Sequence, residues 1–405
     1  MINGMKDGAV THTRQVLGKV AYTETLKKCS EIAGWEVGSS RVRGSVRKDI
    51  KGSQIAEPYI PGKEFKSEEA MKLCRDRFKY GRGVGTGWYG IGRCATIDKA
   101  GAFVEIDDGG TAMILTGVSE IGEGILTVLT QIAADELGMY PEDITIGDND
   151  TARVPEAAHV GASRQTYMIG NAVCNACRDV KKKFIREMAA YWNIDSSSIC
   201  MKNRRIYVEG NAQYNLSLKE AVDICKKIRG IVPLGSGTYT AHHEGLDPVD
   251  GRGNPWQAYV FGTQIAEVAV DTFTGEVHVL GIWAAHDVGR VINPRGVEGQ
   301  IEGGAVQSMG QTIMENYVLS EGVPTNKNFA KYILPTSVDV PEIHSYLVEE
   351  RDPFSPVGAK GIGEPAPLPT APAIVNAIYD AVGVRITSLP AIPEKILNEI
   401  SKMKN

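Results

Sequence analysis

Residues 257–285, QAYVFGTQIAEVAVDTFTGEVHVLGIWAA, contain two long apolar runs on either side of the short stretch Thr272–Gly275. Runs rich in Val, Ile and aromatic residues that flank a turn containing glycine are typical of paired strands. The segment therefore predicts a long β-hairpin, with strands over Gln257–Asp271 and Glu276–Ala285.

Helical and strand patterns alternate on both sides of this hairpin. Apolar residues recur at helical spacing in eight segments: Tyr22–Trp35, Ser67–Phe78, Ile125–Leu137, Thr166–Trp192, Leu216–Ile228, Val297–Met314, Thr370–Val382 and Pro393–Lys402. A second hairpin is predicted over Ala102–Ile106 and Thr111–Thr116, and a further strand within 141–150. Since strands and helices interleave, the predicted class is mixed α/β (α+β) in two lobes. The predicted domains are an N-terminal segment 1–80, a first part 81–235 and a second part 236–405.

Composition excludes several classes of function. The net charge of −5 argues against a nucleic-acid partner, which normally meets a basic surface. No apolar run reaches the roughly 18 residues that a membrane helix needs, and the first residues lack the apolar core of a signal peptide. We therefore expect a cytoplasmic protein with a small-molecule substrate and no membrane partner.

Glycine is unusually frequent, with 45 among 405 residues, against a usual share of about 7%. Many of these glycines fall in the clusters Gly81–Gly92, Gly117–Gly124 and Gly358–Gly363. Such clusters suit a backbone that turns sharply or approaches a ligand closely.

The seven cysteines do not resemble a disulfide framework, because their number is odd and they are scattered along a long chain. Cys174 and Cys177 have CxxC spacing but fall within a predicted helix. No second pair completes a tetrahedral metal site, so we expect no iron–sulfur cluster in this chain.

The stretch 357–372, VGAKGIGEPAPLPTAP, places Glu364 between glycine and proline in apolar surroundings. A carboxylate in such a setting is hard to explain as part of a solvated face. Burial would raise the pKa of this carboxyl and make Glu364 a candidate general base near neutral pH. The alternative is that Glu364 caps the following helix.

Two glycine-containing segments precede predicted helices and could bind an anion there. TGVSEIGEG (116–124) carries Glu120 and Glu123, and a plain structural turn is at least as well supported. In HVGASRQT (159–166), Ser163 either caps the helix or presents its hydroxyl and nearby amides to a phosphate or pterin, with capping favoured. Neither segment fits the P-loop or the Rossmann pattern.

Four stretches taken in order resemble the C-terminal half of the molybdopterin-binding subunit of the xanthine dehydrogenase and aldehyde oxidase family. They are SEIGEGILTVLTQIAADELG (119–138), GASRQTYMIGNAV (161–173), AAHDVGRVINPRGVEGQIEGGAVQSMG (284–310) and GAKGIGEPAPLPTAPAIVNAI (358–378). The resemblance extends from Gly81 to about Pro393. It implies the two-lobed molybdopterin-binding domain of that family.

The resemblance also implies a reaction. Glu364 corresponds to the family's base, which removes a proton so that an oxygen derived from water attacks an electron-poor carbon. The implied cofactor is molybdenum with molybdopterin or its cytosine dinucleotide form. The resemblance further implies that the metal is held through the pterin dithiolene and not by protein side chains, and that electrons leave through iron–sulfur clusters and FAD on partner subunits.

The resemblance assigns further residues to the cofactor and the substrate. Those implied to contact the cofactor are Gly161, Ala162, Ser163, Thr166, Gln300 and Glu123. Trp88 and Tyr89 stand where family members place an aromatic that packs on the substrate, and ordinary core packing is an equal alternative.

Glu123 departs from the family pattern, because "GEG" replaces the usual "GQG" at residues 122–124. An ionised carboxylate accepts hydrogen bonds and cannot donate them. Either Glu123 is protonated, or it faces a hydrogen-bond donor, or the cofactor is bound differently from the way the family binds it.

The family's N-terminal molybdenum lobe has no counterpart in these residues. The sequence therefore resembles either a naturally split member, such as the medium molybdopterin subunit of nicotinate dehydrogenases, or a truncated longer subunit; we favour the split. The implied partners are a second molybdopterin-binding lobe or subunit, a [2Fe–2S] subunit and an FAD subunit. The expected function is hydroxylation of a purine- or nicotinate-type heterocycle, or oxidation of an aldehyde. The alternatives are an aromatic acyl-CoA reductase or CO dehydrogenase subunit, or a non-catalytic subunit that holds the cofactor for assembly.

Overall fold

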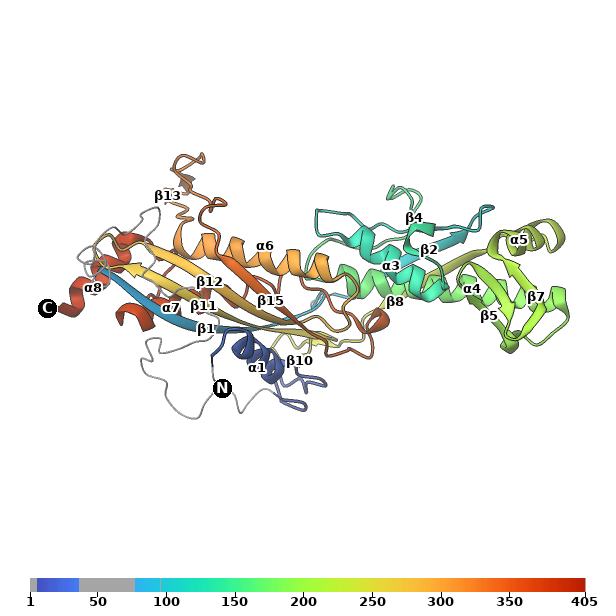
Figure 1. The fold of residues 1–405 in the computed structure, drawn as a ribbon, viewed down its shortest axis with the longest axis horizontal. Helices are drawn as coiled ribbons and strands as arrows, with labels where there is room; N and C mark the ends of the chain where they lie inside the picture. The colour runs from blue at the N-terminus through green and yellow to red at the C-terminus, as the bar shows by residue number, and fades with distance from the viewer. Residues whose placement is uncertain (1–5, 36–76, 95, 405) are drawn as a thin grey trace.

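The computed structural model describes residues 6–35, 77–94 and 96–404. It confirms the mixed α/β class, with two groups of elements arranged along the long axis of the molecule (Figure 1). The predicted helix Ser67–Phe78 lies outside the described residues apart from its last two positions. Within the described ranges, no helix is both long and apolar enough to cross a membrane.

The first lobe is built on a four-stranded sheet in the order β1-β11-β12-β15. Its strands are β1 (Phe78–Gly90), β11 (Tyr259–Asp271), β12 (Val277–Asp287) and β15 (Glu342–Val348). β11 pairs antiparallel with β1 and β12, whereas β15 runs parallel to β12. The predicted long hairpin is thus confirmed as β11 and β12.

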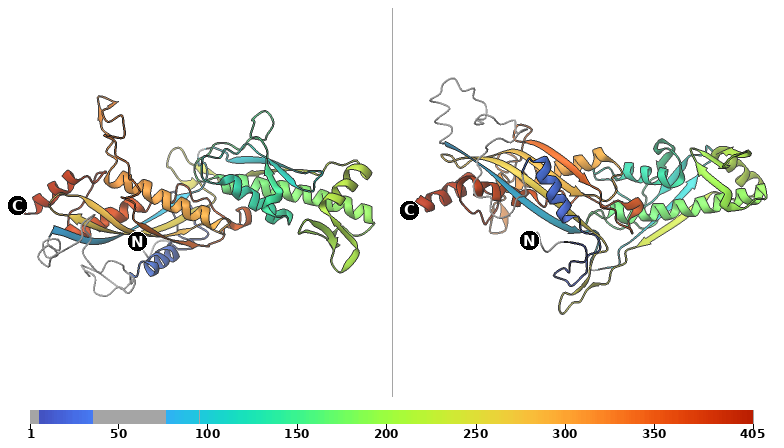
Figure 2. Two further views of the ribbon diagram at one scale, coloured as in Figure 1. Left: turned by 45° about the horizontal axis from the view of Figure 1, so that its top comes forward. Right: turned by 60° about the horizontal axis from the view of Figure 1, so that its bottom comes forward.

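Helices cover both faces of this sheet: α1 (Tyr22–Ile32), α6 (Pro294–Ile313), α7 (Thr370–Val382) and, beyond them, α8 (Pro393–Lys404). Side chains alternate between the two faces along a strand. Accordingly Val268 of β11 packs with α6 and α7, whereas Ile265 packs with Cys29 of α1 on the opposite face. Figure 2 shows α1 against the side of the sheet away from α6.

Alternate glycines on β1 allow α7 to lie directly on the strand. A Cβ at these positions would fall close to a carbonyl oxygen of α7 or its N-cap: Gly81 at 2.2 Å from Ala377, Gly83 at 2.2 Å from Ala373, and Gly85 at 2.1 Å from Pro369. The same holds for Gly235 and Gly237 in the strand Leu234–Thr240: a Cβ at either position would lie 2.2 Å from a carbonyl oxygen of the helix Gly170–Trp192. The prediction that these β1 glycines mark a sharp turn or a ligand contact is therefore wrong, because their close neighbour is a helix backbone.

The second lobe is formed by the chain between β1 and β11. Its main sheet has the order β4-β3-β2-β8, from β2 (Lys99–Ile106), β3 (Ala112–Leu115), β4 (Ile144–Ile146) and β8 (Leu234–Thr240). α3 (Ile125–Leu137) and α4 (Gly170–Trp192) pack on this sheet to form the largest core cluster. The boundary predicted at residues 235 and 236 falls inside β8, which pairs with β2.

The distal end of the second lobe carries a small three-stranded sheet and a short helix: β5 (Ile199–Lys202), β6 (Arg205–Val208), β7 (Asn211–Ser217) and α5 (Leu218–Asp223). The remaining short pairs are β9 (Gly245–Leu246) with β10 (Gly253–Asn254), and β13 (Leu319–Ser320) with β14 (Val323–Pro324). The predicted Ala102–Ile106 hairpin and the predicted helix Ile125–Leu137 are both confirmed.

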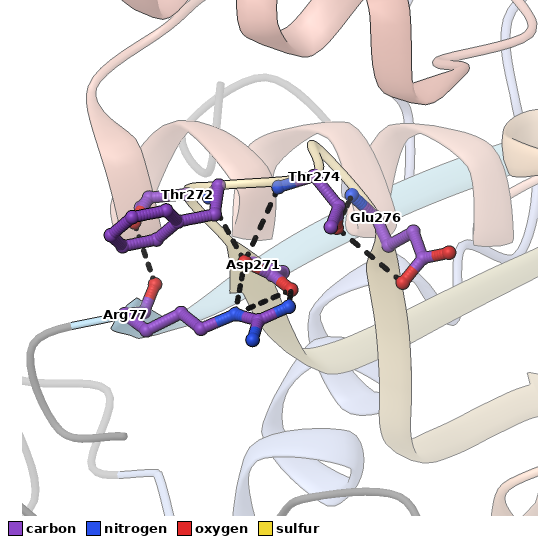
Figure 3. Close-up of polar contacts among 6 residues, drawn as sticks. Arg77, Asp271, Thr272, Thr274 and Glu276 are labelled. Carbon is purple, nitrogen blue, oxygen red and sulfur yellow. Dashed lines mark hydrogen bonds and ion pairs between the residues drawn. The ribbon is translucent and has the colours of Figure 1, made fainter. Parts of the chain in front are cut away.

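The turn between β11 and β12 is held by one buried carboxylate (Figure 3). Asp271 accepts hydrogen bonds from the backbone N–H groups of Phe273 at 2.9 Å and Thr274 at 3.4 Å. Nε of Arg77 lies 2.9 Å from both carboxylate oxygens. Burial opposes ionisation, but Arg77 and the turn amides outweigh it and lower the pKa of Asp271 to about 2.

Candidate active site

A cavity of about 430 Å³ lies where the two lobes meet. Its walls come from four segments that are far apart in the sequence: 121–128, 160–166, 288–300 and 359–364. The first two segments belong to the second lobe and the other two to the first lobe. A cavity of this size can accommodate a small molecule or part of a larger cofactor. Each of the four stretches that carry the family resemblance contributes to its wall.

The cavity brings together most of the predicted site residues. Those that line it are Glu123, Gly161, Ser163, Thr166, Gln300 and Glu364. Ala162 lies beside them, because its N–H donates to Glu364 Oε1 at 3.1 Å. Gln300 and Ser163 both lie close to Gly363, since a Cβ there would be 3.6 Å from Gln300 Oε1 and 3.9 Å from Ser163 Oγ.

Three donors hold the carboxylate of Glu364. Tyr89 Oη donates to Oε2 at 2.7 Å, Ser163 Oγ donates to Oε2 at 3.2 Å, and the N–H of Ala162 donates to Oε1. The backbone N–H of Glu364 in turn donates to Ser163 Oγ at 3.0 Å. Side chains from β1 and from the loop before α4 therefore fix this carboxylate, although it comes from the loop before α7.

The predicted burial of Glu364 is wrong for this chain. Its side chain is exposed, while Pro365 and Ala366 directly after it are buried. The apolar, proline-rich flank packs inward, whereas the glutamate is exposed and forms part of the cavity lining. Capping is also excluded for Glu364, because α7 begins only at Thr370 and has no side-chain cap.

Ser163 does not cap a helix either. The helical turn that follows has Arg164 at its N-cap and no side-chain cap bond, whereas the Ser163 hydroxyl binds Glu364. The capping interpretation favoured from the sequence is wrong, because the partner of this hydroxyl lies 201 positions away in the chain.

The loop Gly161–Ser163 is held in a conformation that side chains rarely adopt. Gly161, Ala162 and Ser163 have φ angles of +154°, +54° and +49°. Non-glycine residues with such angles cost on the order of 1–3 kcal/mol each and persist only where the surroundings enforce them. The turn Gln165–Ile169 that follows is π-helical, a distortion frequent at functional sites.

Arg164 anchors this strained loop from within the core. Its guanidinium is fully buried and pairs with Asp98 at 2.7 Å. It also donates to the carbonyl oxygens of Lys99 at 2.9 Å and His159 at 3.2 Å. A buried charge is tolerated only when it is paired and hydrogen-bonded. Sequence reasoning missed this role, because nothing in the local pattern separates Arg164 from a surface arginine.

The loop that carries Glu364 is tied to the first-lobe sheet at both ends. Lys360 Nζ forms a buried ion pair of 2.7 Å with Asp287 at the end of β12. Gln264 of β11 donates from Nε2 to the carbonyl oxygen of Ala366 at 2.8 Å and accepts from Thr370 Oγ1 at 2.6 Å. These partners lie 73 and 102 positions apart in the chain and carry no local sequence signal.

Two buried oxygens in the cavity wall have no hydrogen-bond partner among the described residues. They are Oε1 of Glu123 and Oε1 of Gln165. Buried polar atoms are normally satisfied, and unpartnered ones point to an absent ligand or water. The residues present therefore fit a cofactor with hydrogen-bonding groups, as the resemblance implies.

The aromatic pair on β1 is divided between the two faces of the strand, as side-chain alternation requires. Tyr89 reaches Glu364, as described above. Trp88 stacks on Tyr259 with ring centroids 5.1 Å apart and an interplanar angle of 21°. It does not belong to the cavity wall and packs instead with a small apolar cluster.

The CxxC pair lies inside the core of the second lobe. Cys174 and Cys177 are fully buried in α4. Burial raises the pKa of both thiols, that of Cys174 to about 12. Across the described parts of the chain, no group of three or more His, Cys, Asp or Glu side chains is arranged to hold a metal ion.

Comparison with known proteins defines the class. The family model of the molybdopterin cofactor-binding domain matches residues 60–341. This match covers more than half of the sequence, so the chain belongs to the molybdopterin cofactor-binding domain family.

Individual relatives place the chain more closely. It is 33% identical over 319 residues to a probable xanthine dehydrogenase subunit of Bacillus subtilis (strain 168), a match that covers 78% of this chain and 41% of the relative. Among solved structures, aldehyde oxidoreductase from Desulfovibrio desulfuricans ATCC 27774 has a TM-score of 0.72 and 27% identity, over 97% of this chain and 37% of that one. Quinoline 2-oxidoreductase from Pseudomonas putida 86 shares the fold with a TM-score of 0.79, at 24% identity, over 98% of this chain and 48% of that one. The chain spans less than half the length of each of these proteins.

Proposed function

We propose that this chain is the cofactor-binding catalytic part of a molybdenum hydroxylase, with Glu364 as its general base. The proposed reaction is oxidation of a heterocycle of the purine or nicotinate type, or of an aldehyde, with water as the source of oxygen. The observation that carries the proposal is the position of Glu364. Its carboxylate is fixed by Tyr89, Ser163 and Ala162 at the wall of a cavity to which all four resembling stretches contribute.

The proposed cofactor is molybdenum with molybdopterin or its cytosine dinucleotide form. When bound, its metal centre supplies the two-electron oxidation. The residues that would hold it are Glu123, Gly161, Ala162, Ser163, Thr166, Gln165 and Gln300. The unpartnered buried oxygens of Glu123 and Gln165 and the strained loop at Gly161–Ser163 support this assignment.

The side chains around Glu364 suit the task of receiving a proton. A general base must lie within hydrogen-bond reach of the proton that it accepts, and Glu364 is both exposed and part of the cavity lining. Burial, followed by the nearby Glu364 carboxylate, raises the pKa of Tyr89, so this phenol stays a donor at neutral pH. Tyr89 and Ser163 would therefore orient the carboxylate and leave its lone pairs available to substrate-bound or cofactor-bound protons.

Partner subunits would complete this site. The matched part of this chain covers only 41% of the Bacillus protein. We propose a second molybdopterin-binding lobe or subunit, a [2Fe–2S] subunit and an FAD subunit, in the cytoplasm. The exposed position of Glu364 in this chain is consistent with a site that a second lobe closes.

Glu364→Gln tests the proposal in the assembled complex. The amide keeps the shape of the side chain and removes its ability to accept a proton, so we expect turnover to fall by at least about three orders of magnitude, within the range of general-base effects. Molybdenum and pterin content should be unchanged. The matched control is Glu302→Gln, an exposed glutamate of α6 that does not line the cavity and should keep full activity. Normal turnover by Glu364→Gln would show that Glu364 is not the base, and would favour a subunit that only holds the cofactor.

A further inference from the structure

The segment between α6 and β15 forms an arm, residues 315–341, that projects away from the body of the molecule (Figure 1). Large apolar residues that are each more than half exposed are concentrated in this arm: Tyr317, Leu319, Val323, Phe329, Ile333 and Val338. No other stretch of equal length in the described parts of the chain exposes as many. Single apolar residues are ordinary on a protein surface, whereas a concentration of them marks an interaction surface.

The arm has a shape of its own that hydrogen bonds hold in place. Asn326 is buried, and its side chain accepts the N–H of Val318 at 3.1 Å and donates to the carbonyl oxygen of Asn316. At the base of the arm, Tyr332 donates to Glu315 at 2.5 Å. The exposed apolar side chains are therefore presented on a preformed surface, which loses less conformational entropy on binding than a loose segment does.

Three glycines lie along the outer ridge of α6. Gly296, Gly299 and Gly303 recur at the spacing that places residues on one side of a helix, and all three are exposed. Apart from the backbone of α6 itself, no atom of the described residues lies within 4 Å of a Cβ built at Gly299 or Gly303. Glycine inside a helix is less stable than alanine, and no contact among the described residues offsets this cost.

The last turns of the same ridge show how closely another segment can pack on it. A Cβ at Gly310 would lie 2.7 Å from Pro335 of the arm and 2.4 Å from Glu315 Oε1. Pro335 is therefore closer to the helix backbone than a larger residue would allow. At its first turn the ridge enters the cavity, which Gly296 and Gln300 line. The ridge thus connects the cavity to the arm over about 20 Å of helix.

We propose that this ridge and the arm form one docking surface, whose occupant is the second molybdopterin-binding lobe of a partner polypeptide. The choice of occupant rests on the proposed function and on the length of the relatives. The matched part of this chain covers 41% of the Bacillus protein and 37% of the Desulfovibrio structure, so more than half of each lies outside the match. That remainder is long enough to contain a further lobe.

The chemistry of the surface defines what the partner presents to it. Bulky apolar side chains fit against the glycine ridge, and apolar pockets fit the side chains of the arm. A lobe seated along the ridge reaches the cavity, where the carboxylate of Glu364 is exposed. Docking on this surface therefore closes the site at the same time.

Binding to that lobe tests the surface directly. The probe is the second lobe produced as a separate polypeptide, from the sequence of the same organism that matches the part of the Bacillus relative outside the match. Val338→Asp changes the arm and Gly303→Leu changes the ridge. The matched control is Val249→Asp, because Val249 is 93% exposed and Val338 90%, but Val249 lies between β9 and β10, away from the surface. Titration calorimetry gives the dissociation constants, and sedimentation velocity gives the oligomeric state of each chain alone.

We expect Val338→Asp and Gly303→Leu each to weaken binding of the lobe by at least about tenfold, as the loss of an important interface contact does. Val249→Asp should bind like wild type. Gly303→Leu should also leave the denaturant midpoint of the isolated chain unchanged or raise it, because its side chain meets open space and leucine favours a helix. Weaker binding without loss of stability separates docking from misfolding.

Wild-type affinity in either surface variant would overturn the docking surface, and so would a wild-type chain that does not bind the lobe. If the chain alone forms dimers that Val338→Asp and Gly303→Leu dissociate, the occupant is a second copy and the proposal is wrong. The molybdenum content of the wild-type complex tests the proposed function separately. A complex that forms through this surface in a host that makes the cofactor, yet contains no molybdenum, would overturn the proposed function alone.

Discussion

Replacing Tyr89 by Phe removes the shortest hydrogen bond to the proposed base. The phenol donates to Glu364 Oε2 at 2.7 Å, while the remaining donors, Ser163 Oγ and the Ala162 N–H, lie at 3.2 and 3.1 Å. A hydrogen bond to a charged group contributes about 1.5–3 kcal/mol. Because Glu364 is exposed, we take the lower end of this range, about 1.5 kcal/mol, which corresponds to a loss in rate of slightly more than about tenfold.

The assay is steady-state turnover of the loaded complex, with kcat and KM determined separately. We expect kcat to fall about tenfold, with KM and molybdenum content little changed, because Tyr89 orients the base and does not hold the cofactor. In a Glu364→Gln background, Tyr89→Phe should change the residual rate by less than about twofold, since coupled residues are not additive. Tyr191→Phe, on an exposed residue of α4, is the matched control. Wild-type kcat in Tyr89→Phe, or a full tenfold loss in the Glu364→Gln background, would refute this role.

Two further predictions concern stability. Gly83→Ala should lower the free energy of unfolding by about 3 kcal/mol or more, because its Cβ would lie 2.2 Å from both Ala373 O and Ala377 N. Gly303→Ala is the control: it lies on α6 with open space around it, so it should raise the free energy of unfolding by about 0.5–1 kcal/mol. Denaturant unfolding measures both, and equal effects would contradict the packing role of the β1 glycines. In the folded chain the pKa of Asp271 is lowered to about 2, whereas in the unfolded chain it is about 3.9. The ionised Asp271 therefore stabilises the folded state fully above about pH 3.9, and this stabilisation is lost as pH falls through the folded pKa. Asp271→Asn should therefore cost about 1–2 kcal/mol at neutral pH and flatten this acid dependence, and an unchanged acid profile would show that the β11–β12 turn does not rely on this charge.

Periodic apolar patterns were sufficient to predict much of the fold. The hairpin β11–β12 and the helix Ile125–Leu137 follow from runs in which most apolar side chains are buried in the core clusters. β1 was not predicted as a strand, because glycine at Gly81, Gly83 and Gly85 removes the apolar side chains that mark one. Those glycines depend on the position of α7, which starts nearly 300 residues later and cannot be read from the local sequence.

The candidate site was predicted in part. Short motifs identified Glu364, Ser163 and Gln300, and the structure places all three around one cavity. The surroundings of Glu364 were predicted incorrectly, because apolar neighbours in sequence do not determine which side of a loop faces solvent. The contacts Lys360–Asp287 and Gln264–Ala366 were missed because they join distant parts of the chain.

The most direct test of the account is a crystal structure of this chain in its cofactor-loaded complex. We expect density for the pterin in the cavity of about 430 Å³ between the lobes, within hydrogen-bond distance of Glu123 and Gln165, and with Glu364 facing the metal centre. Cofactor density elsewhere in the complex, with this cavity filled only by water, would contradict the central claim.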